Sequence, residues 1–315
     1  MFMAKLPNKE FRQMVPLLRE KDFYEAELIR EIAWPEYNLS QIEEASDVLD
    51  FIRESVDKCE CIDRQGRVGR PLTDPKSLAK AVLVCEALGL VERPSQGWIK
   101  ILGPYVGINE ELDERVIGEA YDRIDVAFIL RQVFNMTKES DGILCGDGSG
   151  LEKSRKQNYE SAKKYASYMV SIIDSREIVQ AFELGNKNEH EVMSQLITQV
   201  EGNSLRLDAG FNNRELVKQI ADLEMIPYIF PRIDNNLNGS LAWKNMYLEL
   251  YYDVMTWLTE YHQRSHCESF HSSFKRRNRL LMKLRPLAQL NQVMARIILH
   301  NRRRISYFEK LAKAN

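Results

Sequence analysis

The stretch Ile143-Leu144-Cys145-Gly146-Asp147 decides the fold class of this chain of 315 residues. A short apolar run closed by glycine is typical of a buried strand, and here it follows a long region of helical periodicity. Strand-like runs follow at 166–173, 178–184, 204–207 and 226–230, with a hairpin turn at 174–177 and helical patterns at 189–201 and 212–223. Three successive strands, then strands alternating with helices, predict an α/β fold: a mixed sheet with flanking helices.

An all-helical region precedes the predicted sheet. Residues 1–62 carry apolar residues at helical spacing, and residues 63–71 form a polar, glycine-containing break. Thr73-Asp74-Pro75 opens a further helix that ends near Gly89, and shorter helices follow at about 93–102, 112–120 and 122–136. Short helices of this kind fit a helix-turn-helix DNA-binding unit or a plain bundle, and the pattern favours the bundle. We therefore expect three regions, 1–62, 63–138 and 139–315.

Composition narrows the class of protein. With 44% hydrophobic residues, the chain can bury a core. No apolar stretch reaches about 18 residues, which excludes a membrane span, and the N-terminus lacks the apolar run of a secretion signal. Five cysteines without a CxxC pair argue against a disulfide framework or a structural zinc site. We expect a cytoplasmic protein, associated with the nucleoid if it binds DNA, that has no membrane partner.

Charge is divided unevenly along the chain. Residues 261–315 hold 13 Lys and Arg against 2 Asp and Glu, so this segment carries +11, whereas residues 1–260 carry −13. A basic segment of this kind suggests a polyanionic partner. It is equally compatible with a basic helical face that pairs with the acidic remainder of the chain.

Two aspartates follow directly on predicted strands. Asp147 comes after the first strand and Asp208 comes after the fourth, 204–207, with small residues beside each. If these strands are neighbours, both carboxylates reach one site beyond the strand ends, where ligands bind to open sheets. Adjacent carboxylates repel each other unless a proton or a cation intervenes, and hard oxygen ligands suit Mg²⁺ or Mn²⁺. For either residue alone, Asp beside Gly is also ordinary turn chemistry.

A third signal lies in the basic segment. By their spacing, one face of a predicted helix carries Arg264, Glu268, His271 and Lys275. A carboxylate between cations on a helical face is usually a surface ion-pair ladder. A fixed set distinguishes this one, because two, three and six residues separate Tyr261, Arg264, Glu268 and Lys275.

This set resembles the Y-(2)-R-(3)-E-(6)-K signature of the DDE transposases of prokaryotic insertion sequences at all four positions. Shorter blocks resemble the family's N-terminal start, its two aspartate blocks, the turn before its first helix and its closing helix. In chain order they lie at 69–78, 147–151, 185–191, 207–212 and 299–303. Phe211 stands where the family has tyrosine and Glu191 where it has aspartate. The carboxylates are 61 and 60 residues apart, which leaves no room for a large inserted domain and resembles a compact member.

The resemblance implies a ribonuclease H-like fold and phosphoryl transfer on DNA. It assigns catalysis to Asp147, Asp208 and Glu268, which would hold two Mg²⁺ or Mn²⁺ ions that activate the attacking oxygen and stabilise the leaving one. It assigns phosphate contacts to Tyr261, Arg264 and Lys275, and a cationic track beyond them adds Arg276, Arg277, Arg279, Lys283 and Arg285. The implied partners are double-stranded DNA, at the element ends and the target, and a second copy of the chain in a homodimer on DNA.

Two alternatives to an active transposase stay open: a DNA-binding protein of transposase descent that no longer cuts, and a metal-dependent nuclease without strand transfer. The histidines of 190–271 are interpreted as phosphate contacts or surface residues rather than as metal ligands. Trp243 and Trp257 are more typical of a core than of base stacking. The arginines of 66–71 fit a minor-groove contact or a bare linker equally well.

Overall fold

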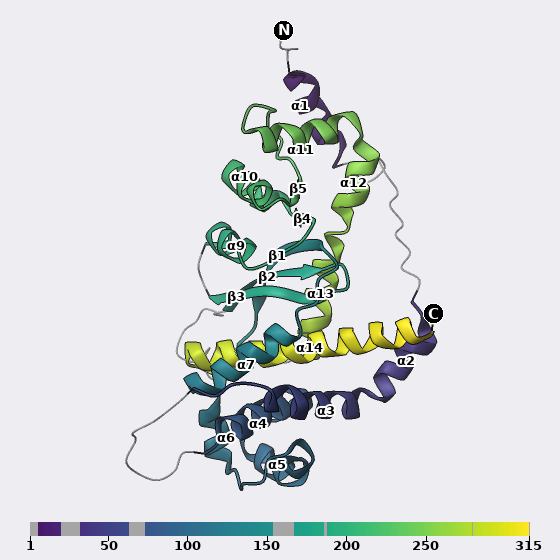
Figure 1. The fold of residues 1–315 in the computed structure, drawn as a ribbon. Helices are drawn as coiled ribbons and strands as arrows, with labels where there is room; N and C mark the ends of the chain where they lie inside the picture. Colours follow the sequence, from purple (N-terminus) through teal and green to yellow (C-terminus); the bar gives the residue numbers. More distant parts are fainter. Residues whose placement is uncertain are drawn as a thin grey trace. The chain divides into compact units, whose positions relative to one another are not determined.

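The computed structural model describes residues 6–19, 32–62, 73–153, 167–185, 188–278 and 280–314, so the predicted break at 63–71 lies outside the described residues. Two compact units make up the chain, and each joins segments that are distant in sequence (Figure 1). The first unit comprises Met1–Glu31, Glu139–Gly150 and Tyr168–Ser272. The second comprises Ile32–Lys138, Leu151–Ser167 and Ser273–Asn315.

A five-stranded sheet of order β3-β2-β1-β4-β5 organises the first unit. Its strands are β1 (Ile143–Leu151), β2 (Ser167–Asp174), β3 (Val179–Gly185), β4 (Ser204–Leu207) and β5 (Ile226–Ile229). The predicted hairpin is confirmed, because β2 and β3 pair antiparallel. β4 pairs parallel with both β1 and β5, so the first and fourth strands are neighbours, as the two-aspartate prediction requires. The apolar run indicated only the first half of β1, since the strand continues through a polar, glycine-rich segment to Leu151.

Helices cover both faces of this sheet. They are α1 (Asn8–Leu17), α9 (Glu189–Ile197), α10 (Arg214–Asp222), α11 (Leu241–Tyr252), α12 (Val254–His262) and α13 (Ser265–Arg277), the last of which continues into the second unit. α9 and α10 lie on one side of the sheet and α12 on the other (Figure 1). Alternation along β4 matches this layering: Leu205 and Leu207 join the core beneath α9 and α10, whereas Arg206 faces α12.

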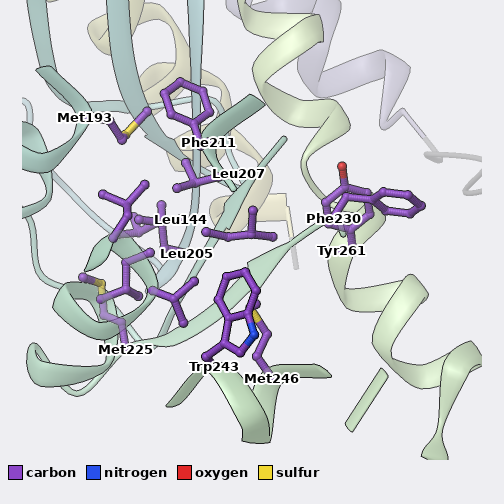
Figure 2. Close-up of a cluster of buried hydrophobic side chains, with 14 of the residues drawn as sticks. Leu144, Met193, Leu205, Leu207, Phe211, Met225, Phe230, Trp243, Met246 and Tyr261 are labelled. Carbon is purple, nitrogen blue, oxygen red and sulfur yellow. The ribbon is translucent and has the colours of Figure 1, made fainter. Parts of the chain in front are cut away.

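The core of the first unit is one continuous apolar cluster (Figure 2). On the sheet side it contains Leu144, Leu205 and Leu207, and apolar residues of α9 and α10 pack against them. Trp243 and Trp257 are each only 3% exposed, which confirms the core interpretation of both residues. Helix α1 belongs to this cluster as well, because Phe11 packs on Tyr247 with ring centroids 5.2 Å apart.

The second unit is a helical bundle in which α4 (Pro75–Leu88) is the central helix. Its helices are α2 (Trp34–Ile42), α3 (Glu44–Asp57), α4 (Pro75–Leu88), α5 (Glu92–Val106), α6 (Glu114–Ala120), α7 (Ile124–Met136) and α14 (Pro286–Ala314). α4 begins and ends where the sequence predicts: the Asp74 side chain accepts the Ser77 N–H, and Gly89 closes the helix in the left-handed region. It contacts α3, α5, α6, α7 and α14, so residues 77–85 are all buried.

Many cations of the basic segment pair with acidic residues inside the second unit. Arg303 lies 2.8 Å from the Glu44 carboxylate, which Arg277 also contacts, and Lys310 lies 2.7 Å from Asp47. A buried pair joins Arg296 to Glu86 at 2.6 Å. Much of the positive charge of residues 261–315 therefore forms ion pairs within the second unit, and only the rest of it is left for an external polyanion.

The β2–β3 turn contains a buried carboxylate. The Asp174 side chain accepts hydrogen bonds from the backbone N–H groups of Arg176 and Ile178, at 3.0 and 2.8 Å, and from the Arg176 guanidinium at 3.0 Å. Burial nevertheless dominates and raises the pKa of Asp174 to about 6. The folded state thus favours the protonated form more than the unfolded chain does.

Asp174 should therefore make stability fall with rising pH. Because its folded pKa lies above its ordinary value, its contribution is full below about pH 4 and is lost as the pH rises to about 6. In urea unfolding, the free energy of wild type relative to Asp174→Asn should drop over this interval by no more than about 3 kcal/mol. Asp222→Asn, at an exposed position, is the control. A relative stability that rises with pH would contradict the assignment.

Candidate active site

Two aspartates lie on neighbouring parallel strands. Asp208 directly follows β4, as predicted, whereas Asp147 lies in the middle of β1 and not after it, because the strand continues to Leu151. The β1–β4 register has a constant offset of 61 residues, seen in the pairs Ile143↔Ser204 and Cys145↔Arg206. The same offset, continued two residues further, sets Asp147 beside Asp208. Neighbouring strands lie about 4.8 Å apart, so the two carboxylates are close enough to influence each other. The two aspartates that the sequence predicts to share a site therefore lie near each other.

Alternation decides which way these aspartates face. Cys145 lies two residues before Asp147, and its Sγ–H donates to the Gln263 carbonyl at 3.2 Å. Arg206 lies two residues before Asp208, and it donates to the Glu260 carbonyl at 2.6 Å. Because side chains two apart in a strand share a face, both aspartates lie on the face that meets the α12–α13 junction.

Arg264 joins the first and third carboxylates at that junction. One of its guanidinium nitrogens lies 2.5 Å from Glu268 Oε1, and the other lies 3.9 Å from Asp147 Oδ2. The sequence predicts that Arg264 and Glu268 lie on one helix. Glu268 does lie on α13, but α13 begins at Ser265, so Arg264 lies in the turn before it. From its position in the turn, the Arg264 side chain reaches Asp147 of the sheet.

Burial and like charges together shape the electrostatics of this site. Burial raises the pKa of Asp147, and the nearby charges of Asp208 and Glu268 raise it further. The backbone N–H of Gly148, at 2.8 Å from Asp147 Oδ1, and the Arg264 guanidinium act in the opposite direction. The carboxylates of this site therefore gain stability from a cation, and Arg264 is the cation that now lies between two of them.

The donor set suits a hard divalent ion by its chemistry. Asp147, Asp208 and Glu268 offer carboxylate oxygens, the ligands that Mg²⁺ and Mn²⁺ prefer. Across the described residues, no group of three or more His, Cys, Asp or Glu side chains is gathered tightly enough to hold a metal ion. Glu268, whose side chain is 61% exposed, is instead directed to Arg264. The three carboxylates are thus of the type that binds such an ion. While Glu268 is paired with Arg264, they do not form a closed set of ligands.

Arg206 fixes the junction that carries Arg264. Its side chain is 1% exposed and forms an ion pair with Glu260, while its Nη1 donates to the Ser204 hydroxyl at 2.8 Å. Its guanidinium also lies over the Tyr228 ring, 5.1 Å from the centroid. A single buried side chain of β4 thereby attaches the C-terminal end of α12 to the strand that directly precedes Asp208.

The turn after β4 is fixed separately. Asp208 Oδ1 accepts the Phe211 N–H at 3.2 Å, which closes the short 3-10 turn Ala209–Phe211. Arg232 donates to the carbonyls of Ala209 and Gly210 at 3.0 and 2.8 Å. Asp208 is therefore held by its own turn and by a side chain from beyond β5.

The predicted DNA-binding residues have different surroundings. Tyr261 is 8% exposed and stacks on Trp257, with ring centroids 5.4 Å apart. Lys275 and Arg276 are exposed in the last turn of α13, whereas Arg277 pairs with Glu44 within the second unit. Arg279 lies outside the described residues. His271 is buried, contrary to its interpretation as a surface residue.

Comparison with known proteins identifies the family of the chain. Residues 138–302, just over half of the chain, match the family described as "Transposase DDE domain". Searches of curated proteins and of solved structures gave no match. The chain therefore belongs to the DDE-domain transposases, which agrees with the resemblance predicted from the sequence and with the mixed, ribonuclease H-like sheet. Membership suggests a metal-dependent enzyme that processes DNA. In the described part of the chain, no helix is both long and apolar enough to cross a membrane.

Sequence reasoning missed the residues that support the carboxylates. Arg206 left a signal, since a charged residue inside a four-residue apolar strand must find a buried partner. Glu260 and Arg232 left none, because their roles depend on contacts between segments 54 and 22 or 23 residues apart.

Arg206→Met should destabilise the first unit. The substitution removes a buried cation and leaves the Ser204 hydroxyl and the Glu260 groups without their donor, which costs about 3 kcal/mol. Urea unfolding followed by tryptophan fluorescence measures this loss. Lys218→Met, at an exposed position on α10, should change stability by less than about 0.5 kcal/mol. Equal stability of the two variants would refute the role of Arg206.

Proposed function

We propose that this transposase binds the ends of a mobile DNA element, cleaves them by metal-dependent hydrolysis and joins the freed 3′-hydroxyl to target DNA. One observation carries the proposal: Asp147 and Asp208 share a register and a face, and Arg264 links Asp147 to Glu268. Three carboxylates near a single guanidinium leave an excess of negative charge, which a bound divalent cation would neutralise.

The three carboxylates would hold the divalent ions. Such ions, when bound, activate an attacking oxygen and stabilise the leaving oxygen of a phosphodiester. Exchange of Arg264 for an ion would release its guanidinium, which can then bind a DNA phosphate through two parallel hydrogen bonds. Glu268 is exposed enough to make this exchange without disturbing the core.

The DNA contacts extend from Arg264 along α13. We propose phosphate contacts for Tyr261, Arg264, Lys275, Arg276, Arg277 and Arg279. Tyr261 would support this role indirectly, because its carbonyl accepts the Arg264 N–H at 3.0 Å and so helps to fix the turn that carries Arg264. Arg277 would have to leave Glu44 to contribute. The region 63–138 is proposed to add DNA contacts as a helical, helix-turn-helix-like region.

The expected assembly and location follow from the reaction. Two element ends must be processed together, so we propose a homodimer on double-stranded DNA. The site of action is proposed to be the cytoplasm, at the nucleoid. A protein of this family that binds DNA without cutting, and a nuclease without strand transfer, are the two competing functions.

One assay separates these functions. The protein is incubated with Mg²⁺ and DNA that carries the element's own terminal inverted repeats. Cleavage with joining supports the transposase, cleavage alone indicates a nuclease, and binding alone indicates a silent DNA-binding protein.

Replacing any of the three carboxylates by Ala should abolish cleavage and leave DNA binding largely intact. Loss of an outer partner of a metal ligand already costs about 10–100-fold, so loss of a ligand should cost more than about 100-fold. Cleavage of a labelled repeat end and gel-shift titration measure the two properties. Asp222→Ala, on the exposed end of α10, is the matched control. Full cleavage by the Asp147, Asp208 or Glu268 variant would contradict the metal assignment.

DNA affinity should fall steeply with salt, because bound cations release counterions from phosphates. The double variant Lys275→Met with Arg276→Met should reduce the slope of log affinity against log salt by about 1 for each phosphate that is no longer neutralised. Fluorescence anisotropy at several salt concentrations measures the slope. Lys218→Met should keep the wild-type slope. A flat salt response of the wild type would count against the cationic track.

A further inference from the structure

The segment 230–237, which follows β5, holds the turn of Asp208 from a part of the chain outside that turn. Arg232 donates to two carbonyls within the turn, at 3.0 and 2.8 Å. The Asn235 side-chain amide donates to Asn212 Oδ1, directly after the turn, at 2.8 Å. Two side chains of one short segment therefore bind the residues that follow Asp208.

A buried tyrosine of α11 completes this network. The Tyr247 hydroxyl accepts a hydrogen bond from the Asn235 side-chain amide at 3.0 Å, and it also contacts the Asn212 amide. Asn212 donates in addition to the Phe230 carbonyl, at 3.1 Å. Tyr247 is fully buried, and a buried polar network whose members are hydrogen-bonded favours a single arrangement. The segment and the turn are therefore fixed to each other and to α11.

Helix α1 holds the same segment near its two ends. Close to the start of α1, Asn8 Oδ1 accepts the Leu237 N–H at 2.8 Å. Two residues beyond the helix, Arg19 donates to the Pro231 carbonyl at 3.3 Å, and its guanidinium lies 5.6 Å from the centroid of the Phe230 ring. These hydrogen bonds join residues that are 229 and 212 positions apart, so they are tertiary contacts that attach the N-terminal helix to the segment.

Apolar packing anchors α1 on the same network. Phe11, Val15 and Leu18 recur at helical spacing and are at most 1% exposed. The Phe11 ring packs on Tyr247, the tyrosine whose hydroxyl binds the segment (Figure 1 shows α1 beside α11). The N-terminal helix is thus part of the packing that surrounds the segment, and its position affects the segment through both polar and apolar contacts.

We infer that α1, with Arg19, is a positioning element of the proposed active site: it holds the segment 230–237, through which Arg232 and Asn235 keep Asp208 in place. This inference rests on the proposed function for the role of Asp208 in cleavage. The register of β4 fixes the chain before Asp208, and the segment fixes the chain after it. Precision matters here, because a reacting group that is misplaced by about 1 Å can cost about 100-fold in rate.

Amide hydrogen exchange of the full chain, measured by NMR, tests this inference. The Phe211 N–H donates to Asp208, so its exchange rate reports how often the turn opens. Arg232→Met, at an exposed position, removes both contacts to the turn and should speed this exchange by about 5-fold. The double variant Asn8→Ala with Arg19→Met releases the segment from α1 and should speed it by about 3-fold. Slowly exchanging amides of β2 and β3 should keep their wild-type rates.

Cleavage of a labelled repeat end in Mg²⁺ gives a second readout. Arg232→Met and the double variant should each lower kcat by about 10-fold and leave KM for DNA unchanged, because the segment holds Asp208 and lies outside the proposed phosphate contacts. The conservative pair Asn8→Asp with Arg19→Lys keeps an acceptor and a donor, and it should restore both readouts. Gln13→Ala, at an exposed position on α1, is the matched control.

Three results would overturn the inference. Wild-type exchange of the Phe211 amide in Arg232→Met and in the double variant would show that the turn holds without the segment. Equal acceleration at Phe211 and throughout β2 and β3 would show a general loss of stability. Faster exchange at Phe211 with a wild-type kcat would show that the position of the turn does not matter for cleavage.

The inference and the proposed function fail in different ways. If Asp208→Ala loses cleavage while Arg232→Met and the double variant cleave like the wild type, the inference is refuted and the proposed function stands. If Asp208→Ala cleaves like the wild type, or the wild type does not cleave, the proposed function is refuted and the catalytic role of α1 with it. Exchange at Phe211 still decides in that case whether α1 holds the turn.

Discussion

The parallel pairing of β1 with β4 is the constraint on which the site depends. Its offset of 61 residues equals the separation of Asp147 and Asp208, so a register shift of one residue would turn one carboxylate to the other face of the sheet. Apolar alternation protects this register, because Leu144, Leu205 and Leu207 must all face the core beneath α9 and α10. The packing of the core thus determines where two acidic side chains meet.

Arg264 offsets the repulsion that this pairing creates. It lies in the turn between α12 and α13, where Arg206 and Glu260 hold the chain against β4, and it reaches Asp147 and Glu268 together. The same guanidinium is proposed to bind phosphate once an ion takes its place. The bound ion would release Arg264, and the released Arg264 would bind a DNA phosphate. Charge balance at the site would then couple the uptake of metal to the uptake of DNA.

Much of this arrangement was predictable from local sequence. The ends of predicted apolar runs pointed to Asp147 and Asp208, although β1 in fact continues past Asp147, and a fixed spacing pointed to Glu268 and Arg264. The rest depends on contacts between distant segments. The sequence predicts a DNA contact for Tyr261, yet its ring stacks in the core on Trp257. The basic segment suggests a nucleic-acid surface, yet much of its charge pairs with α3 and the residue before it, because periodicity does not reveal which helices become neighbours.

The central claim is that Asp147, within β1, and Asp208, directly after β4, share one divalent ion. Anomalous X-ray diffraction at the manganese edge, on crystals of the wild-type protein soaked in Mn²⁺, tests it most directly. The account predicts an anomalous peak within coordination distance of both carboxylates, with Arg264 displaced from Asp147. A peak elsewhere, or an intact Arg264–Asp147 contact with no peak beside it at saturating Mn²⁺, would contradict it.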